Sequence, residues 1–305
     1  MKRILLAYSR SLDAADAIPW LADRYSAEVV TLTLDFGQGR VLEALRDRAL
    51  AAGASRAHVL DVAAAFASEF TVPALRAGAL YTSGKAAIKV LGRMAVAQKL
   101  VEVAAIEQTR TVAHGGGTDD RSMAAAVHAL DARLNAIAVP SAAADVEIGR
   151  RFVASGETPS EPAYVELAFV RGVPSAINGI AMPLFDLIRS VDMLAAAHRV
   201  GRFDGLETPG VAVMHAAHRG LQERVAPDTT ERQALRRQYA DLLQAGGWFS
   251  AGRRSLDEAI AELEEPVSGD VRVQLSRGEC RIIEIKPMDT IIGGVRLQTD
   301  LQRSG

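Results

Sequence analysis

The chain has 305 residues, of which 49% are hydrophobic and 24% charged, which is typical of a globular protein with one large core or two moderate ones. Its 35 basic and 37 acidic residues give a formal net charge of -2, so its overall field attracts neither nucleic acid nor an anionic membrane. No run approaches the roughly 20 apolar residues of a membrane span. We therefore expect a cytoplasmic protein with no nucleic-acid or membrane partner.

The first half of the sequence alternates short β-rich runs with helical stretches. The strands are expected at ILLAY, EVVTLTL, AHVLDV, RTVAHGGG and NAIAVP, and the helices before Tyr25, over residues 41–52 and from Lys85 to Gln108. Gly53 follows the second helix, where a helix C-cap is common. Strands separated by helices indicate a parallel sheet with right-handed crossovers. The predicted fold class is therefore α/β, a Rossmann-like parallel sheet with helices on both faces.

The pattern changes after a stretch rich in Ala, Ser, Glu and Pro. The second half reads as a strand pair around Arg171-Gly172, helices over residues 183–197, 211–225, 231–249 and 255–265, and a hairpin turning at Arg277-Gly278. These elements predict a smaller α+β domain. We expect a first domain over residues 1–142, a linker over residues 143–162 and a second domain over residues 163–305.

Ligands of open parallel sheets bind beyond the carboxyl ends of the strands. Three loops lie there in this sequence, at residues 8–14, 35–40 and 114–121. The first belongs to LLAYSRSLDAAD, an apolar strand that breaks into a small-residue turn, as phosphate-binding turns do. Such turns need bare backbone, yet this one carries Arg10 and Ser11.

The N-terminal half resembles argininosuccinate synthase, of the N-type ATP pyrophosphatase group with an adenine nucleotide alpha-hydrolase-like fold. The family signature LAYSGGLDTS is matched by Leu6, Ala7, Tyr8, Ser9, Leu12 and Asp13. Further segments resemble family segments in the same order, namely EVVTLTLDFGQG, ALAAGAS, PALRAGALY, GRMAVAQKLVEVA and AHG. Fainter echoes follow at HRVGRFD and QYADLLQAGGWF. The sequence is similar to a shortened member of that family.

The resemblance implies a specific chemistry. In that family, ATP adenylates the ureido oxygen of citrulline, pyrophosphate leaves, and the aspartate amine displaces AMP, with positioning and charge stabilisation doing the catalysis. The implied cofactor is ATP or AMP, with Mg²⁺ left open and no metal-ligand residues assigned. The implied cofactor-binding residues are Ala7, Tyr8, Ser9, Ser11, Thr33, Gln38 and Gly115, and the implied catalytic residues are Arg10, Asp13 and Asp119. The implied substrate-binding residues are Tyr81, Lys89, Arg93 and Thr118.

The phosphate turn departs from the family signature. Arg10 and Ser11 replace its two glycines, and Ala14 and Ala15 replace its Thr-Ser pair. Either the Arg10 guanidinium replaces the backbone donors and holds phosphate, or the two side chains fill the site and ATP no longer binds productively. Asp13 either keeps the family role or merely caps the first turn of a helix. The adenosine-side residues either retain a base-binding or AMP-binding function, even if the triphosphate site is lost, or only shape the sheet edge.

The amino-acid sites depart as well. Counted from Tyr81, Lys89 and Val90 occupy the places of a family Thr-Ser pair, and the loop after AHG is short, with Asp119 and Thr118 on the family Asp and Asn positions. Asp119 and its neighbour either ligate Mg²⁺ or form a solvated pair, which is the commoner case. The family segments that contact both amino acids are reduced to residues 141–163 and 205–210. We predict that the chain is not a competent argininosuccinate synthase.

Two classes of function stay open. The first is an ATP-dependent, AMP-forming C–N ligase, in specialised metabolism, for an amino-acid-like substrate other than citrulline. The second is a non-catalytic paralogue that acts as a binding or regulatory partner. We favour the ligase. We also expect a homo-oligomer, and a dimer before a tetramer, because the sequence ends at Gly305 without the family's C-terminal oligomerisation helix.

Two further residue types are assigned from their context. His215 and His218 lie at i and i+3 on one predicted helix, with His198 nearby in the sequence, and we expect a surface or interface role for them instead of a metal site. The lone Cys280 excludes a disulfide framework and a thiolate cluster, and is expected to be a buried structural thiol.

Overall fold

The structure of the chain, a computed structural model, describes residues 2–9, 14–37, 41–82, 85–116, 120–140, 158–203, 206–207, 209–226, 229–288, 291–292 and 295–296. The chain forms two compact units. The first contains Met1–Thr71, Lys85–Arg150 and Arg237–Leu256, and the second contains Val72–Gly84, Arg151–Arg236 and Asp257–Gly305. Two short segments are thus grouped differently from the simple division expected, and the linker stays a prediction because most of it lies outside the described residues.

The first unit is built on a five-stranded sheet. Its strands are β1 (Lys2–Ala7), β2 (Ala27–Asp35), β3 (Arg56–Asp61), β6 (Thr111–Gly116) and β7 (Asn135–Pro140). All neighbours pair in parallel, in the order β3-β2-β1-β6-β7. The α/β class and all five predicted strands are confirmed.

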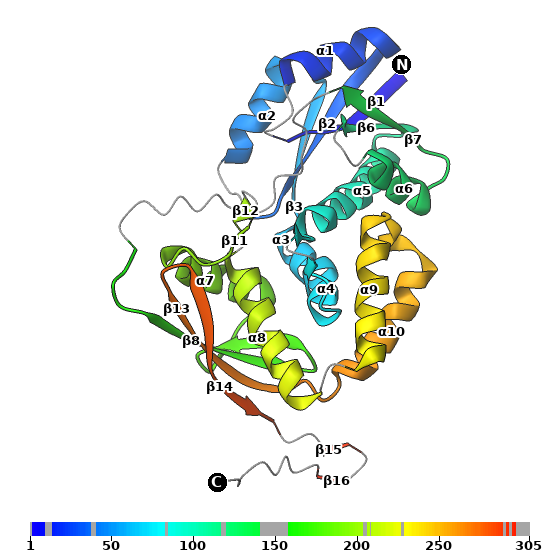
Figure 1. Ribbon diagram of the computed structural model, residues 1–305. Coiled ribbons are helices and arrows are strands. Elements are labelled where there is room, and N and C mark those ends of the chain that lie inside the picture. The colour runs from blue at the N-terminus through cyan, green and yellow to red at the C-terminus, as the bar shows by residue number, and fades with distance from the viewer. Residues whose placement is uncertain are drawn as a thin grey trace, which may run out of the picture. The chain divides into compact units, whose positions relative to one another are not determined.

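Helices cover both faces of this sheet (Figure 1). They are α1 (Ala14–Tyr25), α2 (Val41–Ala51), α5 (Ile88–Ile106) and α6 (Asp120–Leu130). Ile4, Leu6 and Tyr8 alternate along the start of the chain and pack with α1 and α2 in one core cluster. Leu5, between them, is also fully buried, on the face that α5 covers. A central parallel strand that is buried on both faces reads as a continuous apolar run, which is why ILLAY was recognisable.

Several elements of the middle region escaped the sequence analysis. They are α3 (Ala63–Ala65), the π-helix η1 (Phe66–Thr71), α4 (Val72–Arg76), β4 (Tyr81–Thr82), β5 (Lys85–Ala86) and α6. The helix predicted from Lys85 begins at Ile88 instead, so that prediction was wrong for its first three residues.

The second unit contains a five-stranded antiparallel sheet. Its strands are β8 (Ala163–Val170), β9 (Val173–Ile177), β10 (Ile180–Ala181), β13 (Gly269–Ser276) and β14 (Glu279–Pro287), in the order β10-β9-β8-β13-β14. α7 (Leu184–Ala197) and α8 (Pro209–Val225) pack on one face of it (Figure 1). Short pairs are formed by β11 (Arg202–Phe203) with β12 (Leu206–Glu207), and by β15 (Ile291–Ile292) with β16 (Val295–Arg296).

Both predicted hairpins of this unit are confirmed. Arg171-Gly172 and Arg277-Gly278 form their turns, and all four residues have positive φ angles, as type I′ hairpin turns require. The remaining helices are α9 (Thr230–Gln244), the 3₁₀-helix η2 (Gly247–Phe249) and α10 (Ala251–Glu264). The helix predicted over residues 231–249 therefore ends early, because Gly246 adopts a left-handed φ of 76°. Among the described helices, none is both long and apolar enough to cross a membrane.

Candidate functional site

The first unit has a topological switch point beside β1. The chain runs from β1 to β2 and β3 on one side, and then crosses to β6 and β7 on the other. In such sheets, the loops that follow the two strands at the reversal diverge and leave a crevice at the carboxyl edge. Here these strands are β1 and β6, which end at Ala7 and Gly116. The edge predicted to bind a nucleotide is therefore present.

Buried hydrogen bonds fix the backbone directly after β1. The Tyr8 N–H donates to the carbonyl oxygen of Leu32 over 2.8 Å, and the Thr33 hydroxyl donates to the carbonyl oxygen of Tyr8 over 3.0 Å. The side chains of Tyr8 and Thr33 are buried, whereas Ala7 and Ser9 are half-buried. The start of the turn is thus tied to β2, which is the pre-organisation that a backbone binding site requires.

The loop after β2 begins with a turn held by its own carboxylate. Asp35 Oδ1 accepts a hydrogen bond from the Gly37 N–H over 2.7 Å, and Gly37 adopts a φ of 104° that favours glycine. On the far side of β1, the buried His114 ring donates from Nδ1 to the carbonyl oxygen of Gly115 over 3.1 Å. Three loops therefore leave the same sheet edge, as expected.

The predicted cofactor-binding residues divide into two groups. Those that the structure places at the carboxyl edge are Ala7, Tyr8, Ser9, Thr33 and Gly115. The other two, Ser11 and Gln38, lie outside the described residues, as do the predicted catalytic residues Arg10, Asp13 and Asp119 and the predicted substrate-binding residue Thr118, so these assignments stay predictions.

The predicted substrate-binding residues occupy two elements. Lys89 and Arg93 are half-buried and one turn apart on α5, in the first unit, where most neighbouring positions are buried. Tyr81 is half-buried at the start of β4, in the second unit, and its ring lies 5.0 Å from that of His215 on α8.

A buried ionic cluster in the second unit escaped the sequence analysis. The Glu264 carboxylate is fully buried and accepts hydrogen bonds from His218 Nε2 over 2.8 Å, Gln222 Nε2 over 2.6 Å and Arg232 Nη1 over 2.7 Å. Burial alone raises the pKa of Glu264, but the hydrogen bonds and charges of His218, Gln222 and Arg232 outweigh it and hold the pKa below its ordinary value. The cluster joins α8, α9 and α10.

This cluster corrects the expectation for the histidines. His218 and His198 are buried, with exposed fractions of 1% and 4%, so a surface role is wrong for both. The physical reason is that α8 turns His218 inward, toward a carboxylate that lies 46 residues further along the chain. No sequence spacing signals that pairing.

His215 lies one turn before His218 and is a neutral group at physiological pH. Burial lowers its pKa to about 4, with smaller contributions from the charges of His218, Arg219 and Arg236. Because it faces Tyr81, which the family resemblance assigns to substrate binding, His215 is a candidate site residue that sequence reasoning had set aside.

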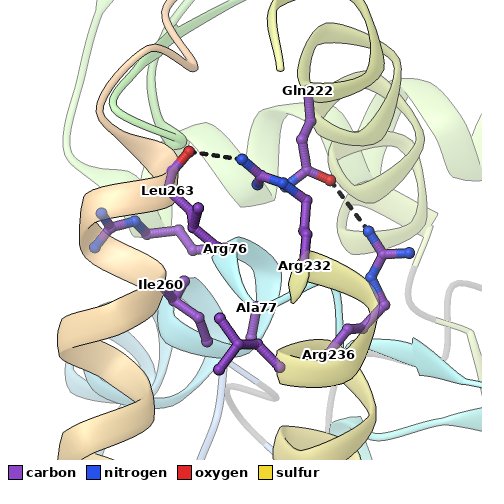
Figure 2. A pocket seen from close by; sticks show the side chains of 8 residues that line it. Arg76, Ala77, Gln222, Arg232, Arg236, Ile260 and Leu263 are labelled. Carbon is purple, nitrogen blue, oxygen red and sulfur yellow. Dashed lines mark hydrogen bonds between the residues drawn. The ribbon is translucent and has the colours of Figure 1, made fainter. Parts of the chain in front are cut away.

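A small cavity lies beside the cluster. Figure 2 shows Arg232 bonded to the Leu263 carbonyl oxygen and Arg236 bonded to Gln222, two of the contacts around it. Its volume of about 10 Å³ suits a single water molecule and is too small for an amino acid or a nucleotide. The carboxyl edge of the first unit therefore remains the better candidate for a ligand site.

The described residues contain no group of three or more His, Cys, Asp or Glu side chains placed to hold a metal ion. Cys280 is half-buried against the core of the second unit, and burial raises the pKa of its thiol to about 11. A thiol with that pKa stays protonated and unreactive at neutral pH.

Strand order, the switch point and the loops beyond it define a Rossmann-like domain of the HUP type joined to a C-terminal domain. Residues 3–153 match the family model described as "Arginosuccinate synthase N-terminal HUP domain", and residues 135–291 match the one described as "Arginosuccinate synthase C-terminal domain". The chain belongs to the argininosuccinate synthase family.

Similarity to family members over most of both chains agrees with this. An argininosuccinate synthase of Desulfitobacterium hafniense (strain DSM 10664 / DCB-2) is 29% identical to this chain over an alignment of 355 positions. The alignment covers 94% of this chain and 88% of that protein. The argininosuccinate synthase of Maricaulis maris (strain MCS10) is 31% identical over 354 residues, which cover 93% and 86%. Both alignments are longer than the 305 residues of this chain, so they contain gaps in this chain. Each relative therefore has internal residues that this chain lacks.

Proposed function

We propose that this chain is an ATP-dependent, AMP-forming C–N ligase whose acceptor is an amino-acid-like molecule other than citrulline. In this reaction a substrate oxygen attacks the α-phosphorus of ATP and pyrophosphate leaves. An amine then attacks the activated carbon, the C–O bond breaks with AMP as the leaving group, and the amine loses a proton as the C–N bond forms. Mg²⁺ would accompany the triphosphate, as it usually does.

The observation that carries the proposal is the pre-organised carboxyl edge beside β1. The buried bond from Thr33 to the Tyr8 carbonyl oxygen and the turn between Asp35 and Gly37 hold the backbone on one side of the switch point. Loops at the carboxyl edge of a parallel sheet commonly carry function, and a fixed backbone there suits ligand binding. Family membership supports ATP as the ligand.

The choice of a different acceptor rests on side chains of α5 and on chain length. Lys89 stands where the family resemblance places a hydroxyl, and it lies one helical turn from Arg93. Two cations on one face favour a substrate with an additional anionic group. The relatives have internal residues that this chain lacks, which agrees with the shortening of residues 141–163 and 205–210. In the family, the longer forms of these two segments are expected to contact citrulline and aspartate.

Calorimetry with ATP, AMP and pyrophosphate, each with and without Mg²⁺, tests the nucleotide site. A panel of amino acids, with citrulline plus aspartate included, is then screened for pyrophosphate release. We expect the chain to bind ATP. We also expect it to release pyrophosphate with an anionic amino acid, but not with citrulline plus aspartate. If neither ATP, AMP nor pyrophosphate binds, the ligase is excluded, and full turnover of citrulline with aspartate would exclude the altered acceptor.

The alternative, a non-catalytic paralogue, is favoured by the replacement of both signature glycines by Arg10 and Ser11. The Arg10→Gly variant separates the two hypotheses. If Arg10 holds phosphate, the change weakens ATP binding by about tenfold or more, the loss of a charge-assisted contact. If Arg10 fills the site, Arg10→Gly with Ser11→Gly creates ATP binding that the parent chain lacks. Calorimetry of the parent, the single variant and the double variant decides between them.

A further inference from the structure

Aromatic side chains are scarce in this chain, at 5% of the residues, yet five of them form one connected row in the first unit. Neighbouring ring centroids lie 4.9, 5.7, 5.2 and 6.2 Å apart, in the range of favourable ring pairs. In order of contact the row consists of Phe36, Phe66, Phe70, Trp248 and Tyr239.

The row begins at the carboxyl edge of the parallel sheet. Phe36 lies between the two residues of the turn that Asp35 and Gly37 form after β2. Its ring is buried and meets the ring of Phe66 edge to face, at an interplanar angle of 77°. The orientation of this turn therefore depends on where Phe66 lies.

The π-helix η1 brings Phe66 and Phe70 into line. Their rings stack at 22°, and the Thr71 hydroxyl donates to the Phe66 carbonyl oxygen, five residues back, over 3.3 Å. π-helical turns are rare in proteins, and those that occur often lie at functional sites. Phe70 then stacks on Trp248 at 15°, so the row continues into η2.

Trp248 is fixed from several sides. Its indole is 3% exposed, the Arg253 guanidinium lies 4.2 Å from the ring centroid, and Tyr239 meets it at 83°. A stacked and cation-bound indole cannot turn without breaking these contacts. It is therefore a rigid end for the row.

Residues 246–248, which include Trp248, also contact α6, the helix that follows the loop after β6. At Gly246, two residues before Trp248, a Cβ atom would lie 2.6 Å from the Ser122 carbonyl oxygen, so the two backbones touch directly. Ser122 is buried in the first turn of α6, which begins at Asp120, just after the loop that follows β6. Residues 246–248 thus contact the first turn of α6 directly and the turn at Phe36 through the aromatic row.

We infer that Trp248 is a positioning residue for the nucleotide site. It acts on the turn after β2 through Phe70, Phe66 and Phe36, and on the start of α6 through the neighbouring Gly246. That these loops hold ATP rests on the proposed function, whereas the mechanical link rests on the contacts above. A residue of the C-terminal half of the sequence thereby sets the geometry of an N-terminal site.

Two variants and a matched control test this inference in the full chain. Trp248→Leu removes the stack, Trp248→Phe retains a ring, and Phe169→Leu removes an equally buried ring from the core of the second unit. We expect Trp248→Leu to weaken ATP binding about tenfold, Trp248→Phe to retain most of the affinity, and Phe169→Leu to leave it unchanged. In a Trp20→Phe background, Trp248 emission should change with ATP along the calorimetric isotherm.

Hydrogen exchange separates this inference from the proposed function, because it needs no nucleotide. Amides of residues 33–37 and 120–126 should exchange faster in Trp248→Leu than in the parent chain and in Phe169→Leu. Unchanged exchange at both segments overturns the inference, even if ATP binds. If the parent chain binds neither ATP, AMP nor pyrophosphate, the proposed function is overturned, while the exchange comparison still decides the role of Trp248.

Discussion

Loss of the Glu264 carboxylate should destabilise the chain strongly. It is fully buried, and three donors depend on it, one of them the guanidinium of Arg232, which is 7% exposed. Changing Glu264→Gln leaves that cation without its counter-charge, which typically costs about 3–5 kcal/mol. We expect a loss of that order in the free energy of unfolding, measured by urea denaturation. The control is Glu265→Gln, next in sequence but exposed, which should change stability by less than about 0.5 kcal/mol.

The pH dependence of that difference follows from the lowered pKa. A carboxylate whose pKa is lower in the folded state contributes stability that is fully present above its unfolded value of 4.5 and is lost as the pH falls through the folded value. The gap between parent and Glu264→Gln should therefore narrow only in acid, below about pH 4.5. A gap that is constant down to pH 3 would contradict the assigned cause.

Asp192 shows the opposite behaviour. It lies on α7, accepts a hydrogen bond from the Gly210 N–H at the start of α8 over 2.6 Å, and burial raises its pKa from 3.8 to about 6 despite that bond. A raised pKa means that the stability contribution of this group is full below pH 3.8 and is lost as the pH rises through 6. Asp192→Asn keeps the acceptor without the charge.

We therefore expect Asp192→Asn to be more stable than the parent chain by about 1–2 kcal/mol at pH 7, and equal to it near pH 4. Urea denaturation at both pH values measures this. The exposed Asp186→Asn, on the same helix, should show no comparable pH-dependent gain. If Asp192→Asn is less stable at pH 7, the attraction of the carboxylate to the start of α8 exceeds its desolvation cost.

At the scale of elements, two glycines in the turns on either side of β9 form a matched pair. Gly172 and Gly179 both have a φ of 76°, so a side chain at either position carries the same backbone strain. A Cβ at Gly172 would overlap Glu264, whereas a Cβ at Gly179 meets nothing within 4 Å. Gly179→Ala should cost about 1 kcal/mol, and Gly172→Ala at least twice that, in the free energy of unfolding. Equal losses would show that the β8–β9 turn moves away from Glu264 without cost.

The sequence predicted the elements that carry a strong period or an explicit turn. NAIAVP corresponds residue for residue to β7, and the hairpin turn at Arg277-Gly278 lies where its glycine indicated. α6 is an exception, because it was missed although its apolar residues recur with a helical period. η1 was missed because no local pattern distinguishes a π-helix from an α-helix, a difference that tertiary packing decides.

The candidate site divides in the same way. The sheet edge with Tyr8 and Thr33 could be predicted, because strand order alone determines which loops share an edge. The Glu264 cluster could not, since its donors precede it by 32 to 46 residues and lie on two other helices. Trp248 was visible only as part of a family-like segment. Contacts between distant segments depend on packing that no short window of sequence records.

For the whole molecule, both tryptophans belong to the first unit. Trp20 lies on α1 and Trp248 in η2, and the chain has no others. Indole fluorescence therefore reports the unfolding of the first unit, whereas far-ultraviolet circular dichroism reports both units. A ligand that binds only the folded state stabilises the unit that holds it, by about 2.7 kcal/mol at 100 times its Kd.

Since the candidate ATP edge is in the first unit, ATP at that concentration should raise the fluorescence-detected Tm by roughly 5–10 °C. Thermal scans with both probes, with ATP and Mg²⁺ or with Mg²⁺ alone, measure the shift, and repetition in Trp20→Phe confines the signal to Trp248. A rise seen by circular dichroism without a rise in the fluorescence-detected Tm would place the nucleotide site in the second unit. If the units unfold independently, the circular dichroism curve should contain one transition that ATP shifts and one that it does not. A single transition that shifts together with the fluorescence would mean that the two units unfold together, because a ligand can stabilise residues that do not touch it only where unfolding is cooperative.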